Sequence, residues 1–176
     1  MLRKLMTGVI CTFAILASQQ GAMAQPTATD SQTFNVVVES QLSIQAPATV
    51  SIIHDQTDTN QVFAAQGWLA RCNNGLGGTV SFSTATPFQA VVGATTYRRN
   101  AQMGLAVGTS DVGSGWATVV SSATATTVSP VATVSAASTA PGDATLNLSM
   151  TFVDNNFSAL PAATFSTTVT ATITAN

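Results

Sequence analysis

Charged side chains are scarce in this chain of 176 residues, of which only five are basic and seven are acidic. Two of the basic residues, Arg3 and Lys4, stand at the amino terminus, so the remaining chain has three arginines and no lysine. Nucleic-acid binding and attachment to anionic membranes both depend on clustered basic side chains. The composition therefore argues against a nucleic-acid partner and against a polybasic membrane contact.

Histidine and cysteine are almost absent as well, with one histidine, His54, and two cysteines, Cys11 and Cys72. A structural zinc site takes about four Cys or His ligands, and a Ser-His-Asp hydrolase needs a histidine beside its nucleophile. His54 adjoins Asp55, but the chain has no Gly-x-Ser-x-Gly turn to present a serine. We expect no enzyme, no catalytic residue and no cofactor.

One oxygen-rich turn is a weak candidate for calcium. Asp55, Asp58 and Asn60 lie within six residues of one another, and calcium prefers carboxylate and amide oxygens. The turn lacks the glycine and the terminal glutamate of the twelve-residue calcium loop. Asp and Asn are also ordinary turn formers, so we expect no metal here.

The first 24 residues have the three parts of a secretory signal peptide. Arg3 and Lys4 precede an apolar run over residues 5–17, which is too short to span a bilayer comfortably. Ala22-Met23-Ala24 then supplies the small-x-small cleavage pattern. The pattern predicts export, to the periplasm, the cell surface or the medium, with a flexible leader over residues 25–32. Cys72 would then have no partner in its own chain, which leaves a buried thiol or an intermolecular thiol bridge.

Strand patterns dominate residues 33–176, and no stretch shows a helical period. Apolar side chains alternate with polar ones over 33–38, 144–152 and 167–174, as in strands with one face buried. We predict a single all-β domain, an antiparallel Ig-like β-sandwich of about nine strands, with a jelly roll as the alternative.

Two parts of the middle are less regular. The Asn/Gly-rich stretch 73–78 predicts a tight hairpin between strands at 62–72 and 79–84. Residues 121–140 are almost all Ser, Thr, Ala and Val. Their β-branched side chains favour one or two strands, broken near Pro130.

Aromatic residues are few, at 6% of the chain. We expect Trp68 and Trp116 in the core. Tyr97 beside Arg98 and Arg99 is the candidate surface contact, because it lies in the only local cluster of positive charge.

Three stretches together resemble a known family: residues 33–53, the run Arg71-Cys72-Asn73-Asn74-Gly75 leading into 79–82, and residues 165–175. They are similar to secreted bacterial pilin-like domains, including spore coat protein U-like and archaic chaperone–usher subunits. The resemblance implies an Ig-like sandwich without catalytic residues, in a family in which many members polymerise by lending a strand to a neighbour.

These observations predict a structural or adhesive protein of the cell surface or envelope. Its partners would be copies of itself or related envelope subunits, joined by strand pairing along an open sheet edge. The alternative is a secreted ligand-binding module, most plausibly for carbohydrate.

Overall fold

The computed structural model describes residues 28–176. Its compact unit comprises Val38–Asn176, and residues 28–37 belong to a separate unit. The expected signal peptide and its cleavage site lie outside the described residues. In the part that is described, no helix has the length and hydrophobicity needed to cross a membrane.

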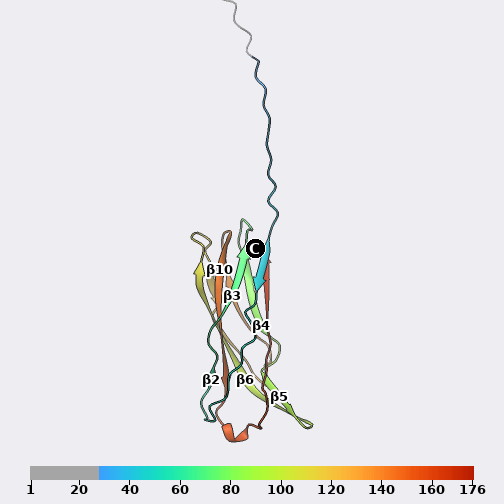
Figure 1. Cartoon of the computed structure of the whole chain (residues 1–176), viewed down its shortest axis with the longest axis vertical. Helices are drawn as coiled ribbons and strands as arrows, with labels where there is room; N and C mark the ends of the chain where they lie inside the picture. Colours follow the sequence, from blue (N-terminus) through green and yellow to red (C-terminus); the bar gives the residue numbers. More distant parts are fainter. Residues whose placement is uncertain (1–27) are drawn as a thin grey trace, which may run out of the picture. The chain divides into compact units, whose positions relative to one another are not determined.

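Eleven strands form two antiparallel sheets in the compact unit (Figure 1). The larger sheet contains β1 (Leu42–Gln45), β3 (Gln66–Cys72), β10 (Gly142–Val153), β6 (Thr95–Ser110) and β5 (Phe88–Val92) in that order, with β2 (Gln61–Val62) beside β10 and β8 (Ser122–Ala125) beside β6. The smaller sheet contains β11 (Val169–Ala175), β4 (Gly78–Thr84), β9 (Ala132–Ala137) and β7 (Ala117–Val120) in that order. A single 3-10 turn, η1 (Phe157–Ala159), follows β10.

The core lies between the inner faces of these two sheets. Along β4 every second residue is buried, including Val80 and Phe82, and on β10 Leu146 and Leu148 are buried in the same alternating way. Side chains of a strand point alternately to its two faces, so the alternation in the sequence becomes one buried and one outer face. The all-β antiparallel sandwich prediction is confirmed. Its sheets of seven and four strands differ from the eight-stranded jelly roll.

The hairpin predicted around residues 73–78 is wrong. β3 pairs with β1 and β10, whereas β4 pairs with β11 and β9. The turn therefore carries the chain from one sheet to the other instead of joining neighbouring strands. Gly77 has a φ of 78° here, and a Cβ at this position would meet the Ser138 carbonyl. The local signal for a tight turn was correct, but the choice of strand partner depends on the two sheets and not on the turn.

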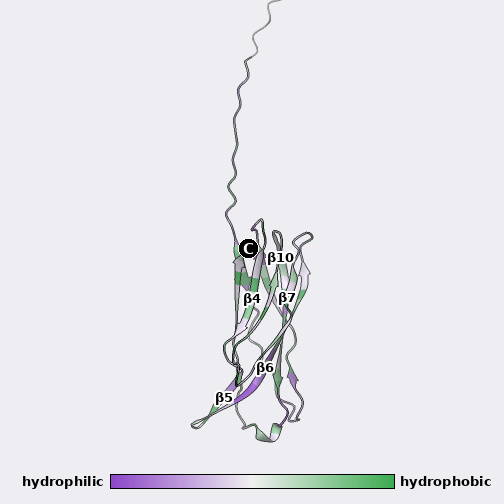
Figure 2. Cartoon of the chain, turned by 180° about the vertical axis from the view of Figure 1, so that it is seen from behind, coloured by the Kyte–Doolittle hydropathy of each residue, from purple (hydrophilic) through white to green (hydrophobic). Residues whose placement is uncertain are grey.

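The low-complexity region does form strands. β8 and β9 lie within residues 121–140, with Pro130 between them, as the β-branched composition predicts. The positively charged cluster at 97–99 is part of the long strand β6 rather than a loop. In Figure 2 it is the strongly hydrophilic stretch of β6 near β5.

Two segments that alternate like strands form none. Residues 33–38 and 50–53 have no strand partner in this chain and carry no strand assignment. Alternation records only which side chains could share a face, whereas a strand also needs a neighbour to accept its backbone hydrogen bonds. The regular fold accordingly begins at Leu42, not at Thr33.

Candidate functional site

An apolar groove of about 1030 Å³ opens between the two sheets. Residues 46–53 and residues 160–168, both without strand structure, line its sides. The groove adjoins the start of β11, where Val169 also lines it. In the described part of the chain no strand pairs with the edge of β11 next to this groove.

The floor of the groove consists of core side chains from the larger sheet and its neighbours. Trp68 on β3 and Met150 on β10 contribute, together with Phe63 and Phe88, whose rings stack at 5.8 Å. Phe88 in turn meets Phe152 edge to face at 5.2 Å. This continuous aromatic and aliphatic surface favours an apolar occupant.

The free edge of β11 adjoins the groove. Among the described residues β11 has one hydrogen-bonded neighbour, β4, with which it pairs from Val169↔Thr84 to Ala175↔Gly78. Val169 and Ile173 remain only partly buried although they pack against the core. β1 lies beside part of this edge without pairing with it. Unpaired backbone N–H and C=O groups on the rest of such an edge can accept an added strand.

Trp68 has an unsatisfied polar atom at this site. Its indole packs edge to face on Phe82 at 5.2 Å, and its Nε1 is buried without a hydrogen-bond partner. A buried N–H without an acceptor costs about 1–3 kcal/mol. Trp116 differs, because its Nε1 donates to the Gly142 carbonyl at 3.1 Å and its side chain is part of the core, as predicted.

A buried ion pair lies at the polar end of the groove, where His54 and Phe157 are among the lining residues. Asp154 is fully buried, and Arg99 Nε donates to its Oδ1 at 2.9 Å. His54 Nδ1 accepts a hydrogen bond from the Gln56 backbone N–H at 3.0 Å. The neutral ring therefore carries its proton on Nε2, which faces Asp154 Oδ2 at 3.5 Å.

This arrangement gives His54 a structural setting. Its ring stacks on Phe157 at 5.1 Å and meets Phe152 edge to face at 5.8 Å. The lone pair on Nδ1, which a general base would use, is already engaged by the Gln56 amide. The histidine holds the segment before β2 against the turn after β10.

Two of the calcium candidates, Asp58 and Asn60, serve the same connection, whereas Asp55 bonds within its own loop. Asp58 Oδ1 accepts from the Phe157 N–H at 2.7 Å, and Asn60 Oδ1 accepts from the Asp154 N–H at 3.1 Å. Asp55 accepts from Thr57, Thr59 and Gln61. Within residues 28–176 no cluster of three His, Cys, Asp or Glu side chains is placed to hold a metal ion.

The loop at Asp55 should be sensitive to acid. Thr57 donates side-chain and backbone hydrogen bonds to the Asp55 carboxylate, which lowers its pKa below the ordinary value. A carboxylate whose pKa is lower in the folded state than in the unfolded state stabilises the fold at pH values above the unfolded-state pKa. This stabilisation is lost as the pH falls through the folded-state pKa. We expect the Thr57 amide resonance to shift with pH below about 4. In Asp55→Asn the shift should disappear, and an equal shift in both proteins would contradict the assignment.

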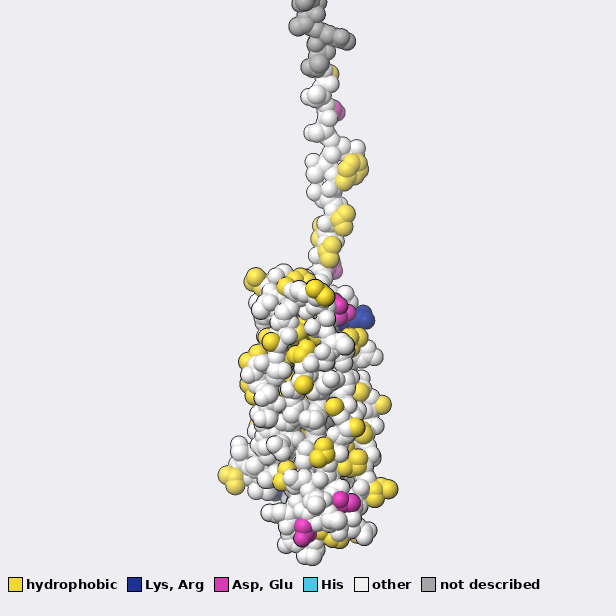
Figure 3. Space-filling model, turned by 90° about the vertical axis from the view of Figure 1, so that its left-hand side faces the viewer, with side chains coloured by type: hydrophobic (Ala, Val, Ile, Leu, Met, Phe, Trp, Pro, Cys, Tyr) yellow, Lys and Arg dark blue, Asp and Glu magenta, His cyan; other side chains and the backbone are white. Residues whose placement is uncertain are grey.

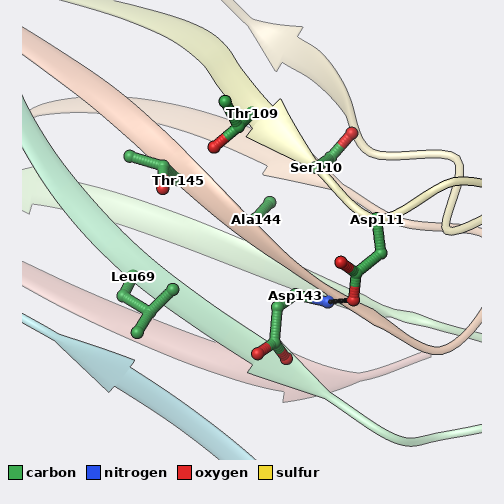
Figure 4. Close-up of a pocket in the computed structure, with 7 residues that line it drawn as sticks. All are labelled: Leu69, Thr109, Ser110, Asp111, Asp143, Ala144 and Thr145. Atoms are coloured by element: carbon green, nitrogen blue, oxygen red, sulfur yellow. Dashed lines mark hydrogen bonds between the residues drawn. The ribbon is translucent and has the colours of Figure 1, made fainter.

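A second, smaller depression of about 150 Å³ is lined by residues of β3 and β10 and of the end of β6 (Figure 4). Asp111 and Asp143 line it together with Thr109, Ser110 and Thr145. Asp111 Oδ2 accepts from the Asp143 N–H at 2.8 Å, and Asp143 Oδ2 lies 3.4 Å from Arg71 Nε. These acids are already engaged within the fold, and they tie the end of β6 to the start of β10.

The other sequence-predicted contacts, Cys72 and residues 97–99, lie partly as expected and partly not. Cys72 is 3% exposed and lies in the core, so its thiol is not presented for an intermolecular bridge. Arg98 is exposed and Tyr97 partly so, but Arg99 turns inward to Asp154 and is not a surface contact. The Arg99–Asp154 pair and the groove itself were not predicted, since neither leaves a local pattern in the sequence.

The leading segment, residues 33–38, is apolar like the groove, but its side chains are exposed instead of lining a hollow. Phe34, Val36 and Val38 are 83%, 88% and 77% exposed, and Val37 is 86% exposed. The hydrophobic side chains of this stretch are uncovered in Figure 3, and the face of the compact unit seen in that view carries few charged side chains. Such a run of exposed apolar residues is unusual on a folded protein.

A scan against protein-family models and searches of characterised proteins and of solved structures found no match to this chain.

Proposed function

We propose that this chain is a non-catalytic structural subunit of the cell surface or envelope. Copies associate by strand addition, in which the leading segment of one copy enters the groove of another. The observation that carries the proposal is that one chain holds both an open apolar groove with a free strand edge and an exposed strand-like segment. Export ahead of assembly rests on the signal-peptide pattern of residues 1–24.

The shapes and chemistry of the two parts match. A strand beside β11 would pair its backbone with the free edge and place every second side chain into the groove. Phe34, Val36 and Val38 are the apolar set of the leading segment, while Asn35 and Glu39 fall on the other face with Val37. Burying the apolar set would remove these side chains from water at about 1.5–3 kcal/mol each.

The composition supports the same conclusion. Few charged side chains line the groove, where His54 is the only titratable residue among those that form it. An uncharged leading face therefore meets an uncharged groove, and specificity rests on shape and backbone hydrogen bonds. The association should consequently depend only weakly on salt.

The proposal is tested by separating the two parts. A variant beginning at Glu39 should remain monomeric in analytical ultracentrifugation, whereas the chain beginning at residue 28 should form oligomers whose size grows with concentration. A synthetic peptide of residues 28–41 should bind the shortened variant and saturate a change in tryptophan emission, because Trp68 lies on the groove floor.

A peptide in which Phe34, Val36 and Val38 are all replaced by serine is the matched control and should not bind. Monomers at every concentration in the longer chain, together with no binding of the parent peptide, would overturn the proposal. A tryptophan response to glycans and none to the peptide would favour the carbohydrate-binding alternative.

A further inference from the structure

Asn73 makes three hydrogen bonds to the residues just before β1. Its side-chain Oδ1 accepts from the Gln41 N–H, its Nδ2 donates to the Glu39 carbonyl at 2.8 Å, and its backbone N–H donates to the Gln41 carbonyl at 3.2 Å. The side chain itself is exposed. A turn asparagine usually bonds to the backbone of its own turn. Asn73 instead uses both the oxygen and the nitrogen of its side-chain amide on one segment about thirty residues earlier in the chain.

These bonds extend the β1–β3 ladder beyond its last pair. Leu42 is opposite Cys72 at the end of that ladder, and Asn73 is the first residue after β3. The asparagine amide supplies one acceptor and one donor, the same groups that a peptide unit of a continuing strand would offer. The root of the leading segment, residues 39–41, is thereby tied to the residue that follows β3.

The position of the root matters because the groove lies at the other end of β1. The groove wall begins at Ala46, directly after β1 ends at Gln45, whereas the root joins β1 at Leu42. To enter its own groove the leading segment would have to reverse direction at residues 39–41. These residues contain no glycine or proline, which favour tight turns. A reversal here would also break the hydrogen bonds of Asn73 to the Gln41 N–H and the Glu39 carbonyl.

We propose that Asn73 is a positioning residue that keeps the leading segment out of its own groove and presents it to a second copy. This inference rests on the proposed strand addition. It adds the residue that makes the leading segment bind a second copy and not its own chain. Holding the root in place also lowers the ordering cost of binding, because fewer backbone angles remain to be fixed when the segment pairs.

The test compares Asn73→Ala with Asn74→Ala in the chain beginning at residue 28. Asn74 lies in the same turn, and its Oδ1 accepts from the Leu76 N–H without touching the root. We expect Asn73→Ala to lower the association constant about fivefold or more, the factor expected for the loss of two modest hydrogen bonds. Asn74→Ala should assemble like the parent.

Two further measurements separate positioning from damage to the fold. The Gln41 amide should exchange with solvent much faster in Asn73→Ala than in the parent or in Asn74→Ala. When the same substitution is made in the variant beginning at Glu39, the affinity of that groove for the peptide of residues 28–41 should stay within twofold of the unsubstituted value.

Each outcome bears on one of the two proposals. Unchanged or stronger assembly of Asn73→Ala overturns the role of Asn73 and leaves strand addition standing. An equal loss in assembly and in peptide affinity also overturns it, because Asn73 would then act through the groove. Absence of both assembly and peptide binding in the unsubstituted chains overturns strand addition itself.

Discussion

Replacing Arg99 with leucine is expected to lower the free energy of unfolding by about 3–5 kcal/mol, as for other buried ion pairs that lose one partner. The Arg99 side chain is 19% exposed and that of Asp154 is 0% exposed. Leucine keeps much of the packing of the arginine stem but removes the only cation bonded to the carboxylate. Asp154 would then keep a buried charge, and its Oδ2 has no hydrogen bond in the native protein, where His54 Nε2 lies 3.5 Å away.

The loss should spread beyond the pair. Asp154 Oδ1 also accepts from the Asn156 N–H, and the Asp154 N–H donates to Asn60. These bonds join the turn after β10 to the segment before β2 at the polar end of the groove. Residues 54–61 and 154–157 should therefore gain amide exchange before the strands of the core do, because local opening follows the loss of local contacts.

Arg98→Leu is the matched control for this experiment. Arg98 is the neighbouring residue on β6 and is exposed, so its replacement should change stability by no more than about 0.5 kcal/mol. Adding Asp154→Asn to Arg99→Leu removes the buried carboxylate charge that has lost its cation. The double variant should therefore recover part of the lost free energy of unfolding. Urea denaturation with linear extrapolation gives the values. Equal stability of Arg99→Leu and Arg98→Leu would contradict the structural assignment.

The sequence allowed the fold class to be predicted because alternation over residues 144–152 and 167–174 reports directly on a buried face. The sequence did not allow the partners of β3 and of β4 to be predicted, since the same Asn/Gly turn can join two strands of a hairpin or carry the chain between two sheets. In the second case the partner is chosen by long-range contacts, here β1 and β10 for β3 and β11 and β9 for β4.

The site was harder to predict for a related reason. Arg99 and Asp154 are 55 residues apart in the chain and meet only when β6 and β10 pair. The groove lies between residues 46–53 and residues 160–168, which form no strand and are brought together only by the folded sheets, so the sequence carries no local pattern for it. The alternation over residues 33–38 predicted a strand that the structure does not contain, because these residues pair with no neighbour in the described part of the chain.

Val36→Asp in the leading segment is expected to weaken association about a hundredfold or more. In the apolar register Val36 is the central member of the set with Phe34 and Val38. Loss of one buried valine contributes about 1.5–3 kcal/mol, and a carboxylate placed in an apolar groove adds a desolvation penalty. Since 1.4 kcal/mol is a factor of ten in an equilibrium constant, the valine alone accounts for roughly a tenfold to hundredfold loss.

Val37→Asp is the control that decides the register. Val37 is as exposed as Val36, at 86% against 88%, and the two variants have the same composition and charge. Adjacent residues of a strand face opposite sides, so a slip of one residue would exchange their roles. With Phe34, Val36 and Val38 in the groove, Val37 faces outward, and Val37→Asp should associate within about threefold of the parent because a rim charge changes affinity little.

Sedimentation equilibrium on the three proteins, the parent and the two variants, distinguishes the cases. A loss in Val36→Asp alone supports strand addition in the apolar register. A loss in Val37→Asp alone would keep strand addition but reverse the face. Equal losses in both would show that the segment acts as a non-specific hydrophobic tail, because only an extended strand seated beside an edge distinguishes neighbouring valines.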